Sequence, residues 1–111
     1  MPIDELPTVI ETYQHAHDRH DTEHAIASFG LDATVTDEDT TFTGIDRVRW
    51  WLVNAAAEYT FTRTLTGVEQ PEHDVYIVHN HLSGNFPGGE VDLQYRFELR
   101  DGLIHHLHIA P

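Results

Sequence analysis

The sequence predicts one α+β domain in which helices pack on one face of a curved, mostly antiparallel sheet. Two observations lead to this prediction. Apolar residues recur at helical spacing through much of the first half of the chain, whereas they alternate with polar residues through most of the second half. Helices followed by a run of strands are typical of α+β proteins. Because the 111 residues contain no repeat or linker, we expect residues 1–111 to form a single domain.

The first helix is predicted close to the N-terminus. Asp4 is a suitable N-cap, and Pro7 falls in the first turn, where a helix tolerates proline. His17 follows Tyr13 by four residues and therefore shares its face. The apolar stripe on that face consists of Leu6, Val9, Ile10 and Tyr13.

A second short helix is predicted after residues 18–21, which are polar enough to end the first. Asp21 can cap this helix, and Gly30 is expected to end it. Its apolar stripe consists of Ala25, Ile26 and Phe29.

Residues 31–43 change from helical spacing to alternation, which predicts a small β-hairpin. Ala33 and Val35 alternate with threonines, and residues 37–39 supply an acidic turn. Continuing the alternation places Asp37 on the same side as Ala33 and Val35. A carboxylate is therefore expected to point toward the apolar side of the sheet.

Helical spacing returns at Ile45 and predicts the longest helix of the chain. Asp46 lies near its N-terminus, where a negative charge is favourable. Trp50 lies off the apolar stripe, so we expect it to cover a second surface. The stripe itself consists of Val48, Trp51, Leu52, Ala55 and Tyr59.

Four long strands complete the predicted fold. The second is apolar on both faces, as in a central strand, and the third alternates most strictly, as in a strand buried on one side. A glycine-containing loop over residues 84–89 and a turn at Asp101 and Gly102 separate the last three strands. The four segments are residues 60–68, 75–83, 91–100 and 103–109.

Composition and charge exclude several classes of function. Six basic side chains, all arginine, against nineteen acidic ones give a formal charge of −13, which argues against nucleic acid and anionic membranes as partners. The absence of cysteine excludes disulfide scaffolds and thiolate metal sites. No apolar run is long enough to span a membrane, and the N-terminus lacks the features of a signal peptide. We therefore expect a soluble cytoplasmic protein.

The ten histidines do not form a recognisable metal motif. His20 and His24 would share a helical face, but the predicted helix break at Asp21 separates them. The chain also has no glycine-rich phosphate loop at the start of a helix and no serine in a nucleophile elbow. We expect neither a metal ion nor a cofactor.

Three short segments, taken with the order of the elements, resemble the nuclear transport factor 2-like superfamily. They are residues 9–13 (VIETY), 32–37 (DATVTD) and 95–97 (YRF). Within the superfamily the sequence is most similar to the SnoaL-like and ketosteroid-isomerase-like branches. This resemblance implies a cone-shaped, cystatin-like fold in which helices and a curved sheet surround a deep apolar pocket.

The resemblance to ketosteroid isomerase also implies roles for individual residues. Tyr13 stands where the family has a tyrosine that donates a hydrogen bond to the substrate oxyanion, and Asp37 stands where it has the carboxylate base. At the position of the second oxyanion donor, a protonated aspartate in the family, this chain has Leu93. Asp92 is adjacent but belongs to the opposite face of the strand.

Asp37, Tyr13 and His81 are the candidate catalytic residues. An inward Asp37 beside apolar walls is suited to moving a proton, although it could instead only cap the turn that follows it. Tyr13 is either the hydrogen-bond donor or a core aromatic. His81, with His79 two residues before it, either projects into the pocket or lies at a dimer surface. Further residues expected to line the pocket are His17, Trp51, Leu93, Tyr95 and Phe97.

Two functional hypotheses follow. In the first, the protein is a cofactor-free isomerase or cyclase acting on a small hydrophobic, ketone-like molecule. Asp37 removes a proton next to a carbonyl, Tyr13 stabilises the enolate, and His81 or His17 assists. In the second, the protein is a ligand-binding or dimerisation module without catalysis, which Leu93 in place of an acid favours. A homodimer is expected under both hypotheses.

The lining of the pocket discriminates between the two hypotheses. A cavity lined by Asp37, Tyr13 and at least one histidine would favour an enzyme. A cavity filled by Trp51, Phe97 and Leu93 would favour a binding or structural role.

Overall fold

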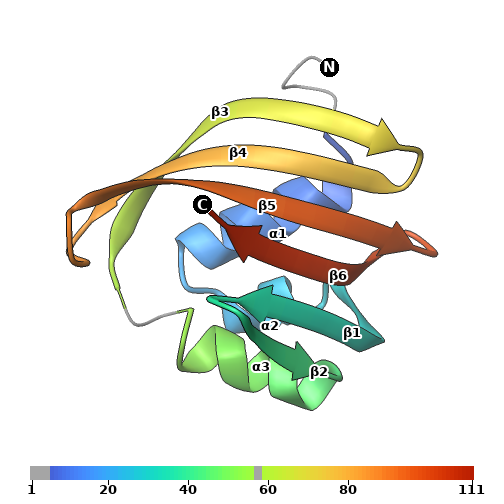
Figure 1. The fold of residues 1–111 in the computed structure, drawn as a ribbon. Helices are drawn as coiled ribbons and strands as arrows, with labels where there is room; N and C mark the ends of the chain where they lie inside the picture. Colours follow the sequence, from blue (N-terminus) through green and yellow to red (C-terminus); the bar gives the residue numbers. More distant parts are fainter. Residues whose placement is uncertain (1–5, 57–58) are drawn as a thin grey trace.

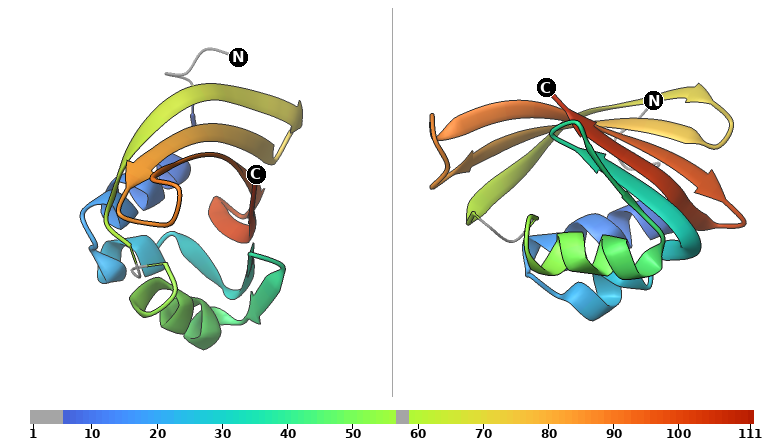
Figure 2. Two further views of the ribbon diagram at one scale, coloured as in Figure 1. Left: turned by 60° about the vertical axis from the view of Figure 1, so that its left-hand side comes forward. Right: turned by 60° about the horizontal axis from the view of Figure 1, so that its bottom comes forward.

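The chain folds into two layers, a curved sheet and a set of helices on one side of it (Figure 1, Figure 2). The computed structural model describes residues 6–56 and 59–111. Its elements are α1 (Thr8–Asp18), α2 (Thr22–Ile26), β1 (Phe29–Asp37), β2 (Thr40–Thr43), α3 (Ile45–Val53), β3 (Phe61–Glu72), β4 (Val75–Gly84), β5 (Glu90–Arg100) and β6 (Leu103–Ala110). The predicted α+β class is confirmed.

One mixed sheet contains all the strands of the described residues, in the order β2-β1-β6-β5-β4-β3. Neighbouring strands are antiparallel except β1 and β6, which run parallel. This parallel pair places Asp37, the last residue of β1, opposite Ile109 near the end of β6. The N-terminal hairpin and the C-terminal strand therefore meet at the same end of the sheet.

The two N-terminal helices begin at identifiable caps. Pro7 occupies the N-cap of α1, and the predicted N-cap, Asp4, lies outside the described residues. Asp21 caps α2 as predicted, because its carboxylate accepts a hydrogen bond from the backbone N–H of His24 at 3.2 Å. No helix in the described part of the chain is both long and apolar enough to cross a membrane.

Two predicted helix ends are wrong. The second helix does not reach Gly30, because Phe29 already belongs to β1 and pairs there with Ile104 of β6. The helix that begins at Ile45 is not the longest, since α3 has 9 residues and α1 has 11. The side-chain amide of Asn54 donates to the carbonyl oxygen of Trp50 at 2.9 Å, and so satisfies an acceptor in the last turn.

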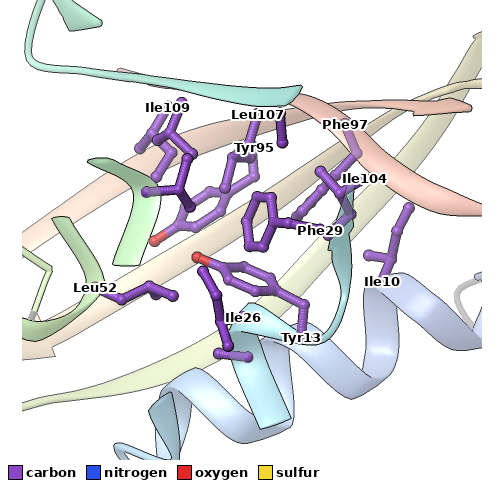
Figure 3. Close-up of a cluster of buried hydrophobic side chains, with 14 of the residues drawn as sticks. Ile10, Tyr13, Ile26, Phe29, Leu52, Tyr95, Phe97, Ile104, Leu107 and Ile109 are labelled. Carbon is purple, nitrogen blue, oxygen red and sulfur yellow. The ribbon is translucent and has the colours of Figure 1, made fainter. Parts of the chain in front are cut away.

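A cluster of buried side chains fills the space between the two layers (Figure 3). Trp50 lies outside this cluster, as expected, and stacks on Phe42 with ring centroids 5.9 Å apart. The largest fully buried side chains in the described residues include Ile10, Tyr13, Val48, Trp51, Phe97, Ile104 and Leu107. They come from both layers, so the core holds α1 and α3 against the sheet.

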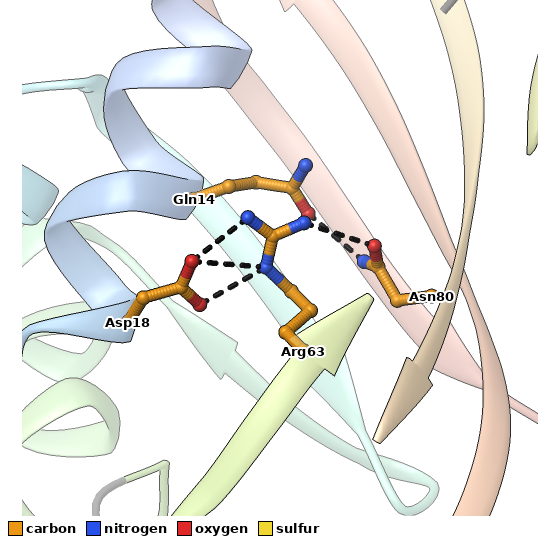
Figure 4. Close-up of polar contacts among 4 residues, drawn as sticks. All are labelled: Gln14, Asp18, Arg63 and Asn80. Atoms are coloured by element: carbon orange, nitrogen blue, oxygen red, sulfur yellow. Dashed lines mark hydrogen bonds and ion pairs between the residues drawn. The ribbon is translucent and has the colours of Figure 1, made fainter. Parts of the chain in front are cut away.

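Four polar side chains form a second link between α1 and the sheet, which we call the polar clamp (Figure 4). The guanidinium of Arg63 on β3 donates to both carboxylate oxygens of Asp18 on α1, with Nε–Oδ1 and Nη2–Oδ2 distances of 2.9 and 2.8 Å. Arg63 also donates to Asn80 of β4 at 3.1 Å. Asn80 in turn donates to Gln14 of α1 at 2.9 Å. The polar clamp therefore ties one face of α1 to two strands.

Candidate functional site

A cavity of about 520 Å³ lies between the helices and the sheet. Its walls come from α1, α3, the β1–β2 turn, strands β3, β4 and β5, and the end of β6. This volume is within the usual range of small-molecule sites, roughly 300–1,000 Å³. Most of the wall is apolar and includes Phe61, Leu82, Phe86, Val91, Leu93 and Ile109. The few polar side chains among them therefore decide what the cavity can recognise.

Asp37 is a half-buried carboxylate on the cavity wall, on the side that the alternation of β1 predicts. The indole Nε1–H of Trp51 donates to its Oδ2 at 3.0 Å. Burial raises the pKa of the Asp37 carboxyl, and hydrogen bonds from Trp51 and from the backbone of Glu38 oppose this shift. Asp37 thus bonds to the turn and faces the cavity at the same time. A carboxyl with a raised pKa is suited to accepting and returning a proton.

Tyr13 presents its ring to the core and its hydroxyl to the cavity region (Figure 3). The side chain is 1% exposed, and its ring packs edge-on against Phe29 and Phe97 at centroid distances of 5.4 and 5.8 Å. Its hydroxyl is buried and has no hydrogen-bond partner within the described residues. Burial raises the pKa of Tyr13 well above its ordinary value, so the phenol stays protonated and can donate.

His17 lines the cavity one helical turn after Tyr13. Its ring stacks against Tyr13 and Trp51 at centroid distances of 5.9 and 6.4 Å. Burial lowers the pKa of His17, although the nearby charge of Asp18 and a hydrogen bond with the backbone of Ala56 oppose the shift. His17 is therefore a neutral imidazole near pH 7, with one nitrogen able to donate and one able to accept.

The alternation of β5 brings Val91, Leu93 and Tyr95 onto the cavity wall. Leu93 and Tyr95 were predicted to lie there, as was Trp51 of α3. The prediction for Phe97 is wrong, because this fully buried side chain packs behind Tyr13 in the core.

His81 lies on the opposite face of the sheet from the cavity, so the expectation that it lines the pocket is not met. Its ring bonds through Nδ1 to Asp92 at 2.7 Å and through Nε2 to Glu90 at 3.2 Å. His79 faces the same way and bonds to Glu69 at 2.5 Å. Hydrogen bonds with Asp92 and Glu90 raise the pKa of His81.

No group of three or more metal-ligating side chains gathers within residues 6–56 and 59–111. His24, one of the two histidines considered for a metal site, bonds instead to Asp21 through Nδ1 at 2.6 Å. The polar side chains of the cavity are carboxylates, phenols and an imidazole, which are groups that form hydrogen bonds with oxygen atoms and transfer protons.

Several cavity residues were not singled out from the sequence. Phe61 shares the alternation of β3 with Arg63, and this signal could have indicated it. Glu38 and Asp39 were assigned only to a turn, yet both line the cavity beside Asp37. The polar clamp could not be predicted from the sequence, because a polar residue within an apolar segment does not reveal which distant residue it bonds to.

Comparison with known proteins supports the architecture. No protein-family model and no curated protein matches the sequence. A candidate polyketide cyclase of Sinorhizobium meliloti is similar in structure, with a TM-score of 0.90 and 29% identity over 99% of this chain and 100% of that one. A Catenulispora acidiphila protein with a ketosteroid isomerase-like fold, in complex with trimethylamine, gives a TM-score of 0.81 at 17% identity over 95% and 85% of the two chains. The chain has a nuclear transport factor 2-like fold.

Other proteins with the nuclear transport factor 2-like fold hold ligands. A Mycobacterium tuberculosis protein in complex with estradiol-17beta-hemisuccinate has a TM-score of 0.77 at 17% identity over 93% of this chain and 90% of that one. The resemblance to the SnoaL-like and ketosteroid-isomerase-like branch that residues 9–13, 32–37 and 95–97 indicated is confirmed at the level of the fold.

Proposed function

We propose that the cavity binds a small apolar carbonyl compound and that Asp37 removes a proton from the carbon next to the carbonyl. One observation carries this proposal: a half-buried carboxylate with a raised pKa shares an apolar cavity with an unpaired phenol and a neutral imidazole. This is the lining that favours an enzyme over a purely structural role. The estradiol derivative held by a protein of the same fold supports a ligand with an apolar skeleton.

The chemistry balances without a cofactor. Asp37 takes the proton, and the electron pair of the broken C–H bond forms a carbon–carbon double bond while the carbonyl oxygen becomes an enolate oxyanion. Tyr13 donates a hydrogen bond to this oxygen, where the negative charge develops. When the ligand is a β,γ-unsaturated ketone, the enolate extends over the second double bond, and return of the proton from Asp37 to its far carbon gives an isomer. When the enolate carbon instead attacks a second carbonyl of the same molecule, a ring forms and Asp37 returns the proton to the new alkoxide oxygen.

His17 completes the proposed proton path. It is neutral near pH 7 and its ring contacts both Tyr13 and Trp51, the indole that bonds to Asp37. A neutral imidazole can accept a proton at one nitrogen and release one at the other. We therefore assign to His17, and not to His81, the assisting role.

Hydrogen–deuterium exchange tests the proposal without knowledge of the natural substrate. The protein is mixed in heavy water with 1-tetralone and 2-tetralone, bicyclic ketones with exchangeable protons, and the loss of the α-proton signal is followed by NMR. The wild-type protein is expected to accelerate exchange. Asp37→Asn keeps an acceptor for Trp51 but cannot take a proton, so exchange should slow by about 100-fold or more.

Asp92→Asn is the matched control, because Asp92 is a carboxylate on the outer face that bonds to His81. It should leave the exchange rate unchanged. Equal exchange in wild type and Asp37→Asn would disprove the role of Asp37 as the base.

A second candidate function is ligand binding without catalysis. Leu93 lines the cavity at the position where the ketosteroid isomerase family has its second oxyanion donor, and leucine cannot stabilise an oxyanion. This function predicts saturable binding of the tetralones with no acceleration of exchange.

The predictions of a homodimer and of a cytoplasmic location stay predictions. Light scattering on the purified chain, in comparison with its mass of 12.7 kDa, tests the first.

A further inference from the structure

We propose that the hydroxyl of Tyr95 is a second hydrogen-bond donor in the cavity and acts with Tyr13 on the same oxygen atom of the ligand. The inference rests on the proposed carbonyl ligand and adds a residue that the resemblance does not supply. It assigns to β5 a donor that Leu93 cannot provide.

The geometry of the two tyrosines supports this assignment. Tyr13 comes from α1 and Tyr95 from β5, and both line the cavity. Figure 3 shows their hydroxyl oxygens turned toward one another, with the apolar side chains of Leu52 and Ile26 beside them. Two polar atoms therefore converge beside apolar side chains of the core.

Neither hydroxyl forms a hydrogen bond with the described residues of the protein itself. Tyr13 has no hydrogen-bond partner within the described residues although its oxygen is fully buried. Tyr95 is 5% exposed, and its hydroxyl likewise makes no hydrogen bond to any described residue. Most buried polar groups in folded proteins are paired, so two unpaired hydroxyls that face each other in a cavity indicate a place for a ligand atom.

The chemistry of two phenols restricts which atom can lie there. Burial raises the pKa of both tyrosines, and the charge of Asp37 adds to this effect, so both stay protonated when Asp37 is ionised. A carbonyl oxygen has two lone pairs and accepts two such donors at once. A protonated amine has no lone pair and cannot. The pair thus selects ligands with a carbonyl group or an oxyanion.

The position on β5 explains why Tyr95 can act in place of an acid at residue 93. Leu93 and Tyr95 are two residues apart on the same face of the strand, so both point to the cavity. The long side chain of tyrosine carries its hydroxyl far from the backbone, to the side of Tyr13. An acid at position 93 is therefore not required for a second donor.

Infrared spectroscopy of bound acetophenone, labelled with ¹³C at the carbonyl, tests this inference. Each hydrogen bond to a carbonyl oxygen lowers its stretching frequency. Tyr95→Phe keeps the ring and removes only the hydroxyl, so the frequency should rise and binding should weaken by about threefold to tenfold. Tyr13→Phe should behave alike, and the double variant should raise the frequency further.

Tyr76→Phe is the matched control. Its hydroxyl accepts a hydrogen bond from Gln70 at 3.1 Å, at an exposed place outside the cavity. This variant should bind acetophenone with the wild-type affinity and frequency.

The inference is overturned if Tyr95→Phe leaves both affinity and frequency unchanged, or if the frequency in the wild-type protein equals that of acetophenone without a hydrogen bond. The exchange assay with Asp37→Asn reports separately on the base. A protein that loses exchange in Asp37→Asn but keeps its spectrum in Tyr95→Phe would retain the proposed function and refute the role of Tyr95.

Discussion

Two residues of the cavity, Tyr13 and Asp37, carry polar groups that the folded chain stabilises poorly. The hydroxyl of Tyr13 is buried without a partner, and the carboxylate of Asp37 is half-buried with an indole N–H as its side-chain partner. Removing such groups from water is unfavourable unless hydrogen bonds compensate. Functional sites often contain buried polar groups of this kind, which lower the stability of the fold but are needed for activity.

This view makes a prediction for Tyr13. Tyr13→Phe removes an unpaired hydroxyl and retains the packing of the ring, so the free energy of unfolding should stay the same or increase by up to about 1 kcal/mol. Urea unfolding followed by tryptophan fluorescence measures it. A decrease of more than about 1 kcal/mol would mean that the hydroxyl has a structural partner and is not available to a ligand.

Single residues were predictable where one face of a strand was clearly apolar. The alternation of Ala33 and Val35 placed Asp37 on the cavity side, and the structure agrees. β4 is rich in apolar residues on both faces, so the same period could not decide which way His81 points. Phe97 has the correct phase but lies where α1 covers the sheet, which no local pattern reveals.

At the scale of elements, the polar clamp fixes the position of α1 over β3 and β4. The side chain of Arg63 is 11% exposed, and that of its partner Asp18 is 34% exposed. Removing one partner of a pair this buried costs more than removing one partner of a surface pair, because the groups left behind lose hydrogen bonds that water replaces only in part. His17, which lines the cavity, lies directly before Asp18 in the chain, so the clamp holds α1 at the turn that carries His17.

Replacing Arg63 should therefore be costly. Arg63→Met removes the bonds to Asp18 and Asn80, and we expect the free energy of unfolding to fall by about 2–4 kcal/mol. Arg49→Met is the matched control, since Arg49 bonds to Glu23 at 2.6 Å but both side chains are well exposed; it should cost less than about 0.5 kcal/mol. Similar losses in the two variants would show that the clamp does not hold α1.

Element boundaries were less predictable than element types. All the predicted helices and strands exist, but helix ends depend on tertiary partners: Phe29 leaves the second helix because β6 pairs with it. α3 ends at Val53, before Ala55 of its predicted stripe, and the side chain of Asn54 bonds back to the last turn. At Phe29 a distant strand competes with the local helix for the backbone, and the spacing of apolar residues along the chain does not reveal this competition.

For the whole molecule, histidines with opposite pKa shifts contribute to the response to pH: the pKa of His81 is raised, whereas burial lowers those of His17 and His106. Carboxylates raise the pKa of His81, so the stability that it contributes is complete below about pH 6.5 and is lost as the pH rises through its folded-state pKa. Burial lowers the pKa of His17, so protonation of the unfolded chain reduces stability as the pH falls below about 6.5. Among these two contributions, stability is greatest near pH 6.5.

This argument predicts the effect of His81→Gln. The wild-type protein should lose stability between pH 6.5 and pH 8, because His81 holds its proton more tightly in the folded than in the unfolded chain and loses it as the pH rises. The variant should lose less stability over this range, because glutamine does not bind this proton. Urea unfolding at several pH values measures the slope. His15→Gln, at an exposed position of α1, is the control and should follow the wild type. An unchanged slope in His81→Gln would contradict the prediction.

The whole fold was more predictable than its details, because it depends on the order and period of the elements and not on any one contact. Residues 9–13, 32–37 and 95–97 indicated the superfamily through elements that all border the cavity. The parallel pairing of β1 with β6 was not predicted, since strands far apart in the sequence leave no local sign of their pairing.

The acidic β1–β2 turn has a consequence for molecules that approach from solution. Asp37, Glu38 and Asp39 all line the cavity, and Glu38 and Asp39 are exposed, so a molecule that approaches this wall from solution meets a cluster of negative charge. A carboxylic acid is repelled, whereas its methyl ester is not, and added salt reduces the difference between their association rates. The hairpin thus adds selection by charge to the selection by shape that the apolar walls provide.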